Sequence, residues 1–247
     1  MVSKAERKPS SIEVEDPNDP KTWKSTLVLP TLNEIEAVRV IVPMIDRSVV
    51  DEILVVDGGS TDGTVEYMRE QGLNVLIQEG RGYGAAMQLA LERASHEIVV
   101  EFPADGSSLI DRIPDVIARM REGYDLVIAS RYKQGAYSED DDLITAFGNR
   151  MFTFLVNRLF GSSYTDVLVG FRALRRSVAL QLGLREEGLS WPCESSIRFV
   201  VHHRKVSEVP ATEPPRIGGT RKMIPHKTGM EILKLIVRER IKLSLGR

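Results

Sequence analysis

Short apolar runs alternate with segments of helical periodicity through the first half of the chain. Runs rich in Val, Ile and Leu predict five strands, at residues 25–29, 52–56, 73–77, 97–102 and 125–129. The segments between these runs have the spacing of helices. Because strands of this composition suit burial on both faces, the alternation predicts an α/β fold, with a mostly parallel sheet flanked by helices.

Beyond residue 131 the pattern changes. An acidic run at residues 140–142 favours the start of a long helix whose apolar positions extend to Leu159. The final segment, residues 227–245, gathers its apolar residues on one broad stripe and its basic residues elsewhere, which predicts a C-terminal amphipathic helix. Between these two helices the pattern predicts an extended segment at 165–175, a helix at 191–203 and a strand at 205–209.

The pattern divides the chain into three parts. Residues 1–23 are expected to be a disordered or extended leader, residues 24–222 the α/β domain, and residues 223–247 a basic amphipathic helix suited to membrane association. The length of 247 residues agrees with one large domain and a small appendage. No apolar run approaches the ~20 residues of a membrane span, and no secretory signal is evident, so the expected compartment is the cytoplasm.

Composition and charge exclude several functions. A single cysteine, Cys193, rules out an intrachain disulfide and a thiolate zinc cluster. The net charge of −2 argues against a nucleic-acid coat. Residues 202–247, however, hold 11 Lys and Arg against 4 Asp and Glu. This asymmetry predicts that the C-terminal part meets phosphate or a membrane surface, with a solvated basic helix as the alternative.

Polar residues follow four of the predicted strands. Asn33, Asp57, Arg81 and Asp105 each come shortly after a strand, where ligands bind in parallel sheets. The first two belong to the turns Pro30-Thr31-Leu32-Asn33-Glu34 and Val55-Val56-Asp57-Gly58-Gly59-Ser60-Thr61-Asp62-Gly63-Thr64. Taken singly, such residues cap helices and form turns.

Taken together, the two turns resemble those of inverting family 2 glycosyltransferases with the GT-A fold, which is Rossmann-like. In that family they hold the nucleotide of a sugar donor. The resemblance implies that Asp57 accepts hydrogen bonds from the base, and a carboxylate suits the N–H donors of uracil and guanine. It also implies that Pro30, Asn33 and Glu34 line the nucleoside pocket.

The turn after the third strand, Gly80-Arg81-Gly82-Tyr83-Gly84-Ala85-Ala86, has the wrong spacing and place for a dinucleotide fingerprint. The resemblance instead implies that Arg81 lies near the donor pyrophosphate, with Gly82 allowing close approach.

The turn after the fourth strand departs from the family. Where the family has Asp-x-Asp, which binds a divalent cation, this chain has Pro103-Ala104-Asp105. The resemblance therefore implies that Asp105 and Ser107 contact Mg²⁺ or Mn²⁺, with Ala104 beside the donor. Mg²⁺ often uses one or two carboxylates with substrate phosphate and water, so the loss weakens this expectation without removing it.

Two further segments resemble polyprenyl-phosphate sugar synthases of the dolichyl-phosphate mannose synthase type. They are Ser130-Arg131-Tyr132 and the pattern Asp166-x-x-x-Gly170-Phe171-Arg172. The resemblance implies that Arg131 binds the lipid phosphate and that Asp166 organises the acceptor side. Glu194 is either a general base for a hydroxyl acceptor or structural. In the segment 216–222, Arg221 and Lys222 are expected to close over the phosphates.

The resemblance implies inverting transfer of a hexose from a nucleotide diphosphate sugar, of the GDP-mannose or UDP-glucose type, to a polyprenyl phosphate. The reaction is expected at the cytoplasmic membrane face, in cell envelope glycan biosynthesis. A membrane-embedded protein is a further candidate partner, and no nucleic acid is expected. The alternatives are transfer to a sugar hydroxyl in polysaccharide or glycan assembly, and a non-catalytic nucleotide-sugar binding protein. A sugar nucleotidyltransferase is disfavoured, because residues 30–34 are not a glycine-rich basic loop.

Overall fold

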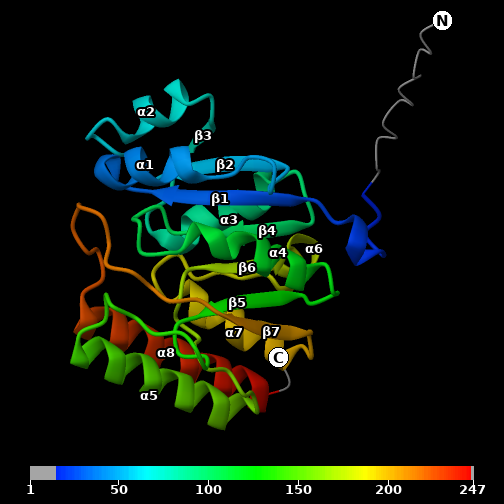
Figure 1. Ribbon diagram of the computed structural model, residues 1–247. Coiled ribbons are helices and arrows are strands. Elements are labelled where there is room, and N and C mark those ends of the chain that lie inside the picture. Colours follow the sequence, from blue (N-terminus) through cyan, green and yellow to red (C-terminus); the bar gives the residue numbers. More distant parts are fainter. Residues whose placement is uncertain (1–14, 246–247) are drawn as a thin grey trace, which may run out of the picture.

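The computed structural model describes residues 15–245, which form a seven-stranded sheet covered by helices (Figure 1). The strand order is β3-β2-β1-β4-β6-β5-β7, and only β6 runs antiparallel to its neighbours. All five strands predicted in the first half are present, and the mostly parallel sheet is confirmed. The strands are β1 (Ser25–Thr31), β2 (Glu52–Asp57), β3 (Asn74–Ile77), β4 (Ile98–Glu101), β5 (Leu126–Ser130), β6 (Arg172–Arg175) and β7 (Val206–Pro210).

Eight α-helices lie within the described residues. Asp142 caps the longest helix of the first 200 residues by accepting a hydrogen bond from the Thr145 N–H (2.7 Å), so the predicted acidic start is confirmed. The helices are α1 (Ile35–Ile41), α2 (Thr64–Glu70), α3 (Tyr83–Arg93), α4 (Ile113–Met120), α5 (Leu143–Phe160), α6 (Arg176–Leu182), α7 (Trp191–Val201) and α8 (Pro225–Ser244), with short 3₁₀ turns at Pro20–Thr22, Val42–Met44 and Ile110–Arg112.

Two expected segments differ in detail. Of the extended segment at 165–175, only β6 is a strand, because the Asp166 carboxylate accepts the N–H groups of Leu168 and Val169 and holds a turn there. The expected leader lies outside the described residues as far as residue 14. Its described part is packed on the domain: Glu15 accepts the N–H of Lys24, and Trp23 is buried.

The core lies on both faces of the central strands, as the apolar composition of β1, β2, β4 and β5 requires. Helices α5 and α8 lie side by side at the β7 end of the sheet (Figure 1). Helix α8 buries only Ile232, Leu235, Ile236 and Glu239. Its remaining apolar stripe is left at the surface.

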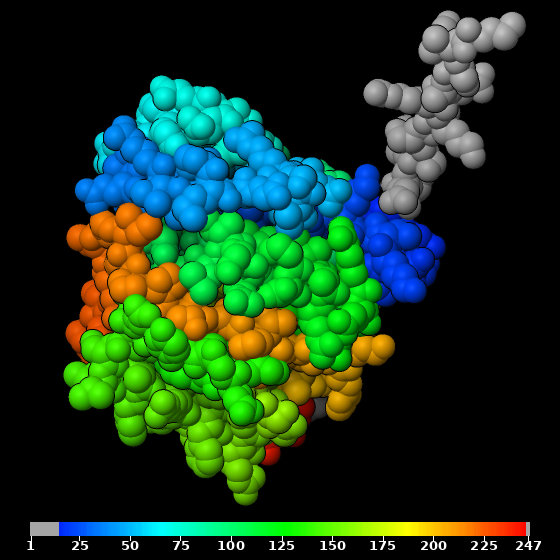
Figure 2. All heavy atoms as spheres, viewed as in Figure 1, coloured from blue at the N-terminus to red at the C-terminus, as the bar shows by residue number. Residues whose placement is uncertain are grey.

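The topology places the candidate chemistry at one edge. Strands β1, β2, β4 and β5 point the same way, so their carboxyl ends meet at that edge. The segment between β7 and α8, residues 211–224, runs across these ends and reaches α1 (orange in Figures 1 and 2). The turns and this segment therefore enclose a common space.

Candidate active site

A cavity of about 1050 Å³ opens at the carboxyl ends of the strands. Its wall combines the strand-end turns, helices α5 and α8, and the segment 211–224. Nine of the residues expected in the site line this cavity: Pro30, Glu34, Gly82, Ala104, Asp105, Ser107, Arg131, Arg221 and Lys222. The others, which lie behind or outside the lining, are Asn33, Asp57, Arg81, Asp166 and Glu194.

Asp57 holds two turns together behind the cavity wall. One carboxylate oxygen accepts the hydroxyls of Thr31 (2.7 Å) and Ser60 (2.6 Å), and the other accepts the N–H groups of Gly59 (2.8 Å) and Ser60 (2.7 Å). The side chain is fully buried, and its neighbour Gly58 lines the cavity instead. The geometry therefore gives Asp57 a turn-holding position, whereas the sequence placed it against the donor base.

Asn33 also works by positioning its neighbours. Its N–H donates to the Ser60 hydroxyl (2.8 Å), and its side-chain oxygen accepts the Thr61 N–H (2.8 Å). Its φ of 54° lies in the left-handed region, which Asn tolerates better than most residues. This turn directs the following residue, Glu34, into the cavity.

The segment after β7 closes over Glu34 with two cations. Arg216 Nη2 lies 3.3 and 3.2 Å from the two Glu34 carboxylate oxygens, and Lys222 forms a second ion pair with the same carboxylate. Burial raises the pKa of Glu34, and the two cations partly offset this effect. Lys222 was expected over the substrate phosphates, and its ion pair with Glu34 was not predicted. Arg216 was not assigned a role, although its place beside a Gly-Gly pair in a basic segment was a usable signal.

The same guanidinium reaches the turn after β4. Arg216 Nη2 lies 3.7 Å from Asp105 Oδ2, and the Ile217 N–H donates to the Asp105 carbonyl (2.8 Å). Gly106, with φ 80°, permits this approach, because a Cβ there would lie 2.7 Å from the Ile217 side chain. Arg216 thus joins the β1 and β4 turns.

The expected divalent cation fits this turn poorly. The Ser107 hydroxyl and N–H both donate to Asp105 Oδ1 (2.7 and 3.0 Å), and Arg216 faces the other oxygen. Among residues 15–245, no three His, Cys, Asp or Glu side chains gather as a metal site. Asp105 and Ser107 do not form a resident cation site by themselves.

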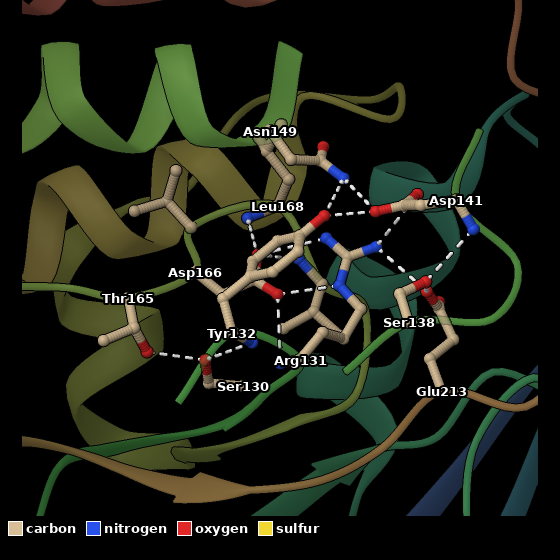
Figure 3. Close-up of polar contacts among 12 residues, drawn as sticks. Ser130, Arg131, Tyr132, Ser138, Asp141, Asn149, Thr165, Asp166, Leu168 and Glu213 are labelled. Atoms are coloured by element: carbon tan, nitrogen blue, oxygen red, sulfur yellow. Dashed lines mark hydrogen bonds and ion pairs between the residues drawn. The ribbon is translucent and has the colours of Figure 1, made fainter. Parts of the chain in front are cut away.

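Arg131 lies among three carboxylates just beyond the end of β5 (Figure 3). Its guanidinium pairs in a fork with Asp166, at 2.7 and 3.1 Å, and its Nη1 lies 3.2 Å from Glu213. Asp141 is 3.8 Å away. Burial acts to raise the pKa of Asp166, but Arg131 and backbone N–H groups outweigh it and hold that pKa below its usual value.

Tyr132 and Asn149 extend this network to Asp141. The Tyr132 hydroxyl donates to Asp141, and Asn149 Nδ2 donates to both, at 3.0 and 2.9 Å. Arg221 lies 3.8 Å from the other Asp141 oxygen, at the cavity wall. Sequence reasoning placed Asp141 only at a helix start and did not single out Glu213.

Glu194 supports the wall without lining it. Its carboxylate is buried and accepts the N–H groups of Arg185 (2.9 Å) and Glu186 (2.7 Å). The adjoining loop packs on α3, where a Cβ at Gly84 would lie 2.0 Å from the Glu186 carbonyl oxygen. Of the two roles left open for Glu194, these contacts favour the structural one. Arg81 is exposed at the surface.

The fold matches that of solved glycosyltransferases. A structure of glucosyl-3-phosphoglycerate synthase from Mycobacterium tuberculosis, in complex with Mn²⁺, UDP-glucose and phosphoglyceric acid, superimposes with a TM-score of 0.69. The two chains are 21% identical, and the match covers 95% of this chain and 85% of that one. The architecture is therefore that of a GT-A glycosyltransferase.

Sequence comparison gives the family. The model of "Glycosyl transferase family 2" matches residues 26–183. The dolichyl-phosphate hexose transferase of Haloferax volcanii is 33% identical over 225 residues, which span 88% of this chain and 96% of the relative. The chain therefore belongs to glycosyltransferase family 2 and is an enzyme of that family.

Two other relatives are similar at 30% identity. Polyprenol monophosphomannose synthase of Mycolicibacterium smegmatis matches over 224 residues, 85% of this chain and 84% of the relative. Glycosyltransferase AglJ of Haloferax volcanii matches over 198 residues, 78% of this chain and 64% of AglJ. Polyprenyl-phosphate sugar transferases thus recur among the relatives.

Proposed function

We propose that this enzyme transfers a hexose, with inversion, from a nucleotide diphosphate sugar to a polyprenyl phosphate. The observation that carries the proposal is the two-sided lining of the cavity. One side consists of polar turns at the ends of β1 and β4, including Glu34 and Asp105. The other is apolar, with Ile144, Phe147 and Met151 of α5. A polar sugar nucleotide and an apolar lipid chain match these two sides.

The chemistry needs little base assistance. An acceptor phosphate is already anionic, so the enzyme mainly positions the two substrates and neutralises the departing diphosphate. The phosphate oxygen forms the new bond to the anomeric carbon as the bond to the diphosphate breaks, and the nucleoside diphosphate leaves with the electron pair. Arg216, Arg221 and Lys222 line the cavity as cations for these anions. The engagement of Glu194 in backbone contacts agrees with a reaction that requires no base.

The donor is proposed to be of the GDP-mannose or UDP-glucose type, with its nucleoside against the β1 and β2 turns. Pro30, Leu32, Gly58 and Gln78 line that part of the cavity. Because the described residues do not form a cation site by themselves, we assign no step to the Mg²⁺ or Mn²⁺ that the sequence suggested.

The apolar surface beside the cavity supports attachment to a membrane. No helix within residues 15–245 is long and apolar enough to span a bilayer. Helix α5, however, leaves Leu143 90%, Phe147 69% and Phe154 65% exposed, and α8 beside it exposes the stripe that contains Val237 and Ile241. We call this surface the α5–α8 face.

Charge and position favour a bilayer as the occupant of the α5–α8 face. Lys234, Arg238 and Lys242 lie beside the α8 stripe, as in helices that bind anionic lipid surfaces. The apolar side of the cavity shares Ile144, Phe147 and Met151 with this face. A polyprenyl phosphate in the cytoplasmic leaflet would therefore lie next to the site.

Nucleoside diphosphate release tests the proposal. The enzyme is incubated with a panel of sugar nucleotides, with and without a short polyprenyl phosphate, and Asp105→Asn serves as the impaired control. Release that depends on the lipid phosphate is expected. Release that depends on sugar hydroxyls instead would indicate glycan assembly, and donor binding without any turnover would indicate a binding protein.

A further inference from the structure

Arg216 occupies a position between two carboxylates that belong to different turns. Its Nη2 lies within 3.3 Å of both Glu34 oxygens and 3.7 Å from Asp105 Oδ2. Its Nε donates to the Gly218 carbonyl (3.2 Å), and the next residue, Ile217, is anchored on the Asp105 carbonyl. The guanidinium is therefore held at the polar end of the cavity by several contacts.

Two carboxylates and a diphosphate at one site require a compensating positive charge. In the solved neighbour with UDP-glucose, Mn²⁺ is present with the donor. In this chain Pro103 stands two residues before Asp105, and no cluster of three metal-ligating side chains exists within residues 15–245. The positive charge that faces Asp105 here comes from a side chain.

We propose that Arg216 takes the place of the divalent cation, bridging Glu34 and Asp105 to the donor diphosphate. The inference rests on the proposed function, because it assumes a nucleoside diphosphate sugar as the donor. A guanidinium has five N–H donors in a fixed plane and pairs well with phosphate oxygens. Arg216 Nη1 makes no hydrogen bond to another described residue, and Arg216 lines the cavity, so donor groups remain for the diphosphate.

Glu34 and Asp105 carry two negative charges, and Arg216 and Lys222 carry two positive ones. These four ion-paired side chains cancel in charge, so the diphosphate needs a further cation, and Arg221 lines the same cavity. The Arg216 guanidinium stays protonated throughout, so the bond to the diphosphate breaks without a proton or a metal. Glu34 and Asp105 act on the donor only through Arg216. Both are positioning residues, because they hold the Arg216 guanidinium in place.

Calorimetric titration with UDP and GDP, in excess chelator and in Mn²⁺, tests the inference on the full chain. For the wild type, the dissociation constant should change less than about threefold between the two conditions, since a side chain supplies the charge. Arg216→Ala should weaken binding in chelator by roughly 10- to 100-fold, the range for charge-assisted hydrogen bonds. Mn²⁺ should restore part of this loss, because no guanidinium then faces Asp105 Oδ2, which can contact the ion together with the diphosphate.

Controls separate the role of Arg216 from folding and from a blocking role. Arg216→Lys keeps the charge without the fork and should lose less affinity than Arg216→Ala. Arg69→Ala removes an exposed arginine on α2 and should change nothing. Thermal unfolding of each variant identifies any that fails to fold. If Arg216→Ala does not fold, the nucleotide affinity of Arg216→Lys is compared with that of the wild type instead.

Four outcomes would overturn the inference. A tenfold or larger loss of wild-type affinity in chelator would mean that a metal is required. Unchanged affinity in Arg216→Ala would remove Arg216 from the donor site, and stronger affinity would show that Arg216 only blocks an empty cavity. If neither nucleotide binds any of the proteins in either condition, the proposed function itself fails, and the inference fails with it.

Discussion

Arg131 and Asp166 form a forked ion pair beneath the cavity, with Nε 2.7 Å from Oδ2 and Nη2 3.1 Å from Oδ1 (Figure 3). The pair joins the end of β5 to the turn before β6 and is almost fully buried. Glu213 and Asp141 complete the surroundings of the guanidinium. Arg131 therefore pairs with Asp166 and Glu213 and lies near Asp141, and its removal would leave Asp166 and Glu213 without a paired cation among the described residues.

We predict that Arg131→Ala mainly destabilises the fold. Breaking a buried ion pair by removing one partner costs about 3–5 kcal/mol, because the remaining charge stays buried. Urea unfolding should show this loss, and Arg131→Lys, which keeps the charge but not the fork, should lose less. A variant of normal stability with a raised KM for polyprenyl phosphate alone would show instead that Arg131 binds the lipid phosphate.

A second prediction concerns Asp57. Asp57→Ala leaves the Thr31 hydroxyl and the N–H groups of Gly59 and Ser60 without their acceptor, and an unsatisfied buried group costs about 1–3 kcal/mol. The variant should lose stability by at least that amount and lose donor affinity as the turns shift. Urea unfolding and nucleotide titration measure the two effects, with the exposed Asp46→Ala as control. A variant that loses nucleotide affinity but keeps the wild-type free energy of unfolding would show instead that Asp57 binds the donor base.

The strands and their polar ends could be predicted from the sequence because both are local features. The apolar residues of a run such as 52–57 indicate a buried strand, and the residues of the turn that follows determine the conformation of that turn. The local pattern could not show whether the Asp57 carboxylate faces the cavity or its own turn, since both uses require the same residues.

Contacts between residues far apart in the chain could not be predicted from the sequence. Arg216 meets Glu34, 182 residues away, and Arg131 meets Glu213, 82 residues away. These contacts depend on how the segment after β7 crosses the sheet edge, and no periodicity or motif encodes that path. The lipid-phosphate role of Arg131 stays a prediction, and its anionic neighbours, which come from three separate segments, could not be predicted from the sequence.

Glu101 provides a pH-dependent prediction. Its carboxylate is fully buried and accepts the Trp191 indole N–H (2.9 Å), and burial raises its pKa to about 7. The folded protein therefore binds this proton more tightly than the unfolded chain, whose carboxyl has a pKa near 4.5. The resulting stabilisation is present below pH 4.5 and is lost as the pH rises through 7.

Glu101→Gln keeps an oxygen acceptor for Trp191 but removes the titration. From pH 4.5 to 7.5, wild-type stability should fall relative to the variant by up to about 3 kcal/mol, at 1.36 kcal/mol per pKa unit. Urea unfolding of both proteins across this pH range measures the difference between their free energies of unfolding. The contributions of the other titrating groups are the same in both proteins and cancel in this difference. Parallel curves would mean that Glu101 keeps an ordinary pKa despite its burial.

The last prediction concerns the α5–α8 face. Phe154 on α5 and Ile241 on α8 are 65% and 53% exposed and lie outside the cavity lining. Phe154→Asp combined with Ile241→Asp should abolish sedimentation with anionic vesicles while leaving nucleotide affinity unchanged, because the face loses its apolar contact and gains negative charge. Val40→Asp, on α1, is the matched control. Wild-type binding should weaken at high salt. Sedimentation of the double variant equal to wild type, or no wild-type binding to any vesicle, would contradict the assignment of this face to a bilayer.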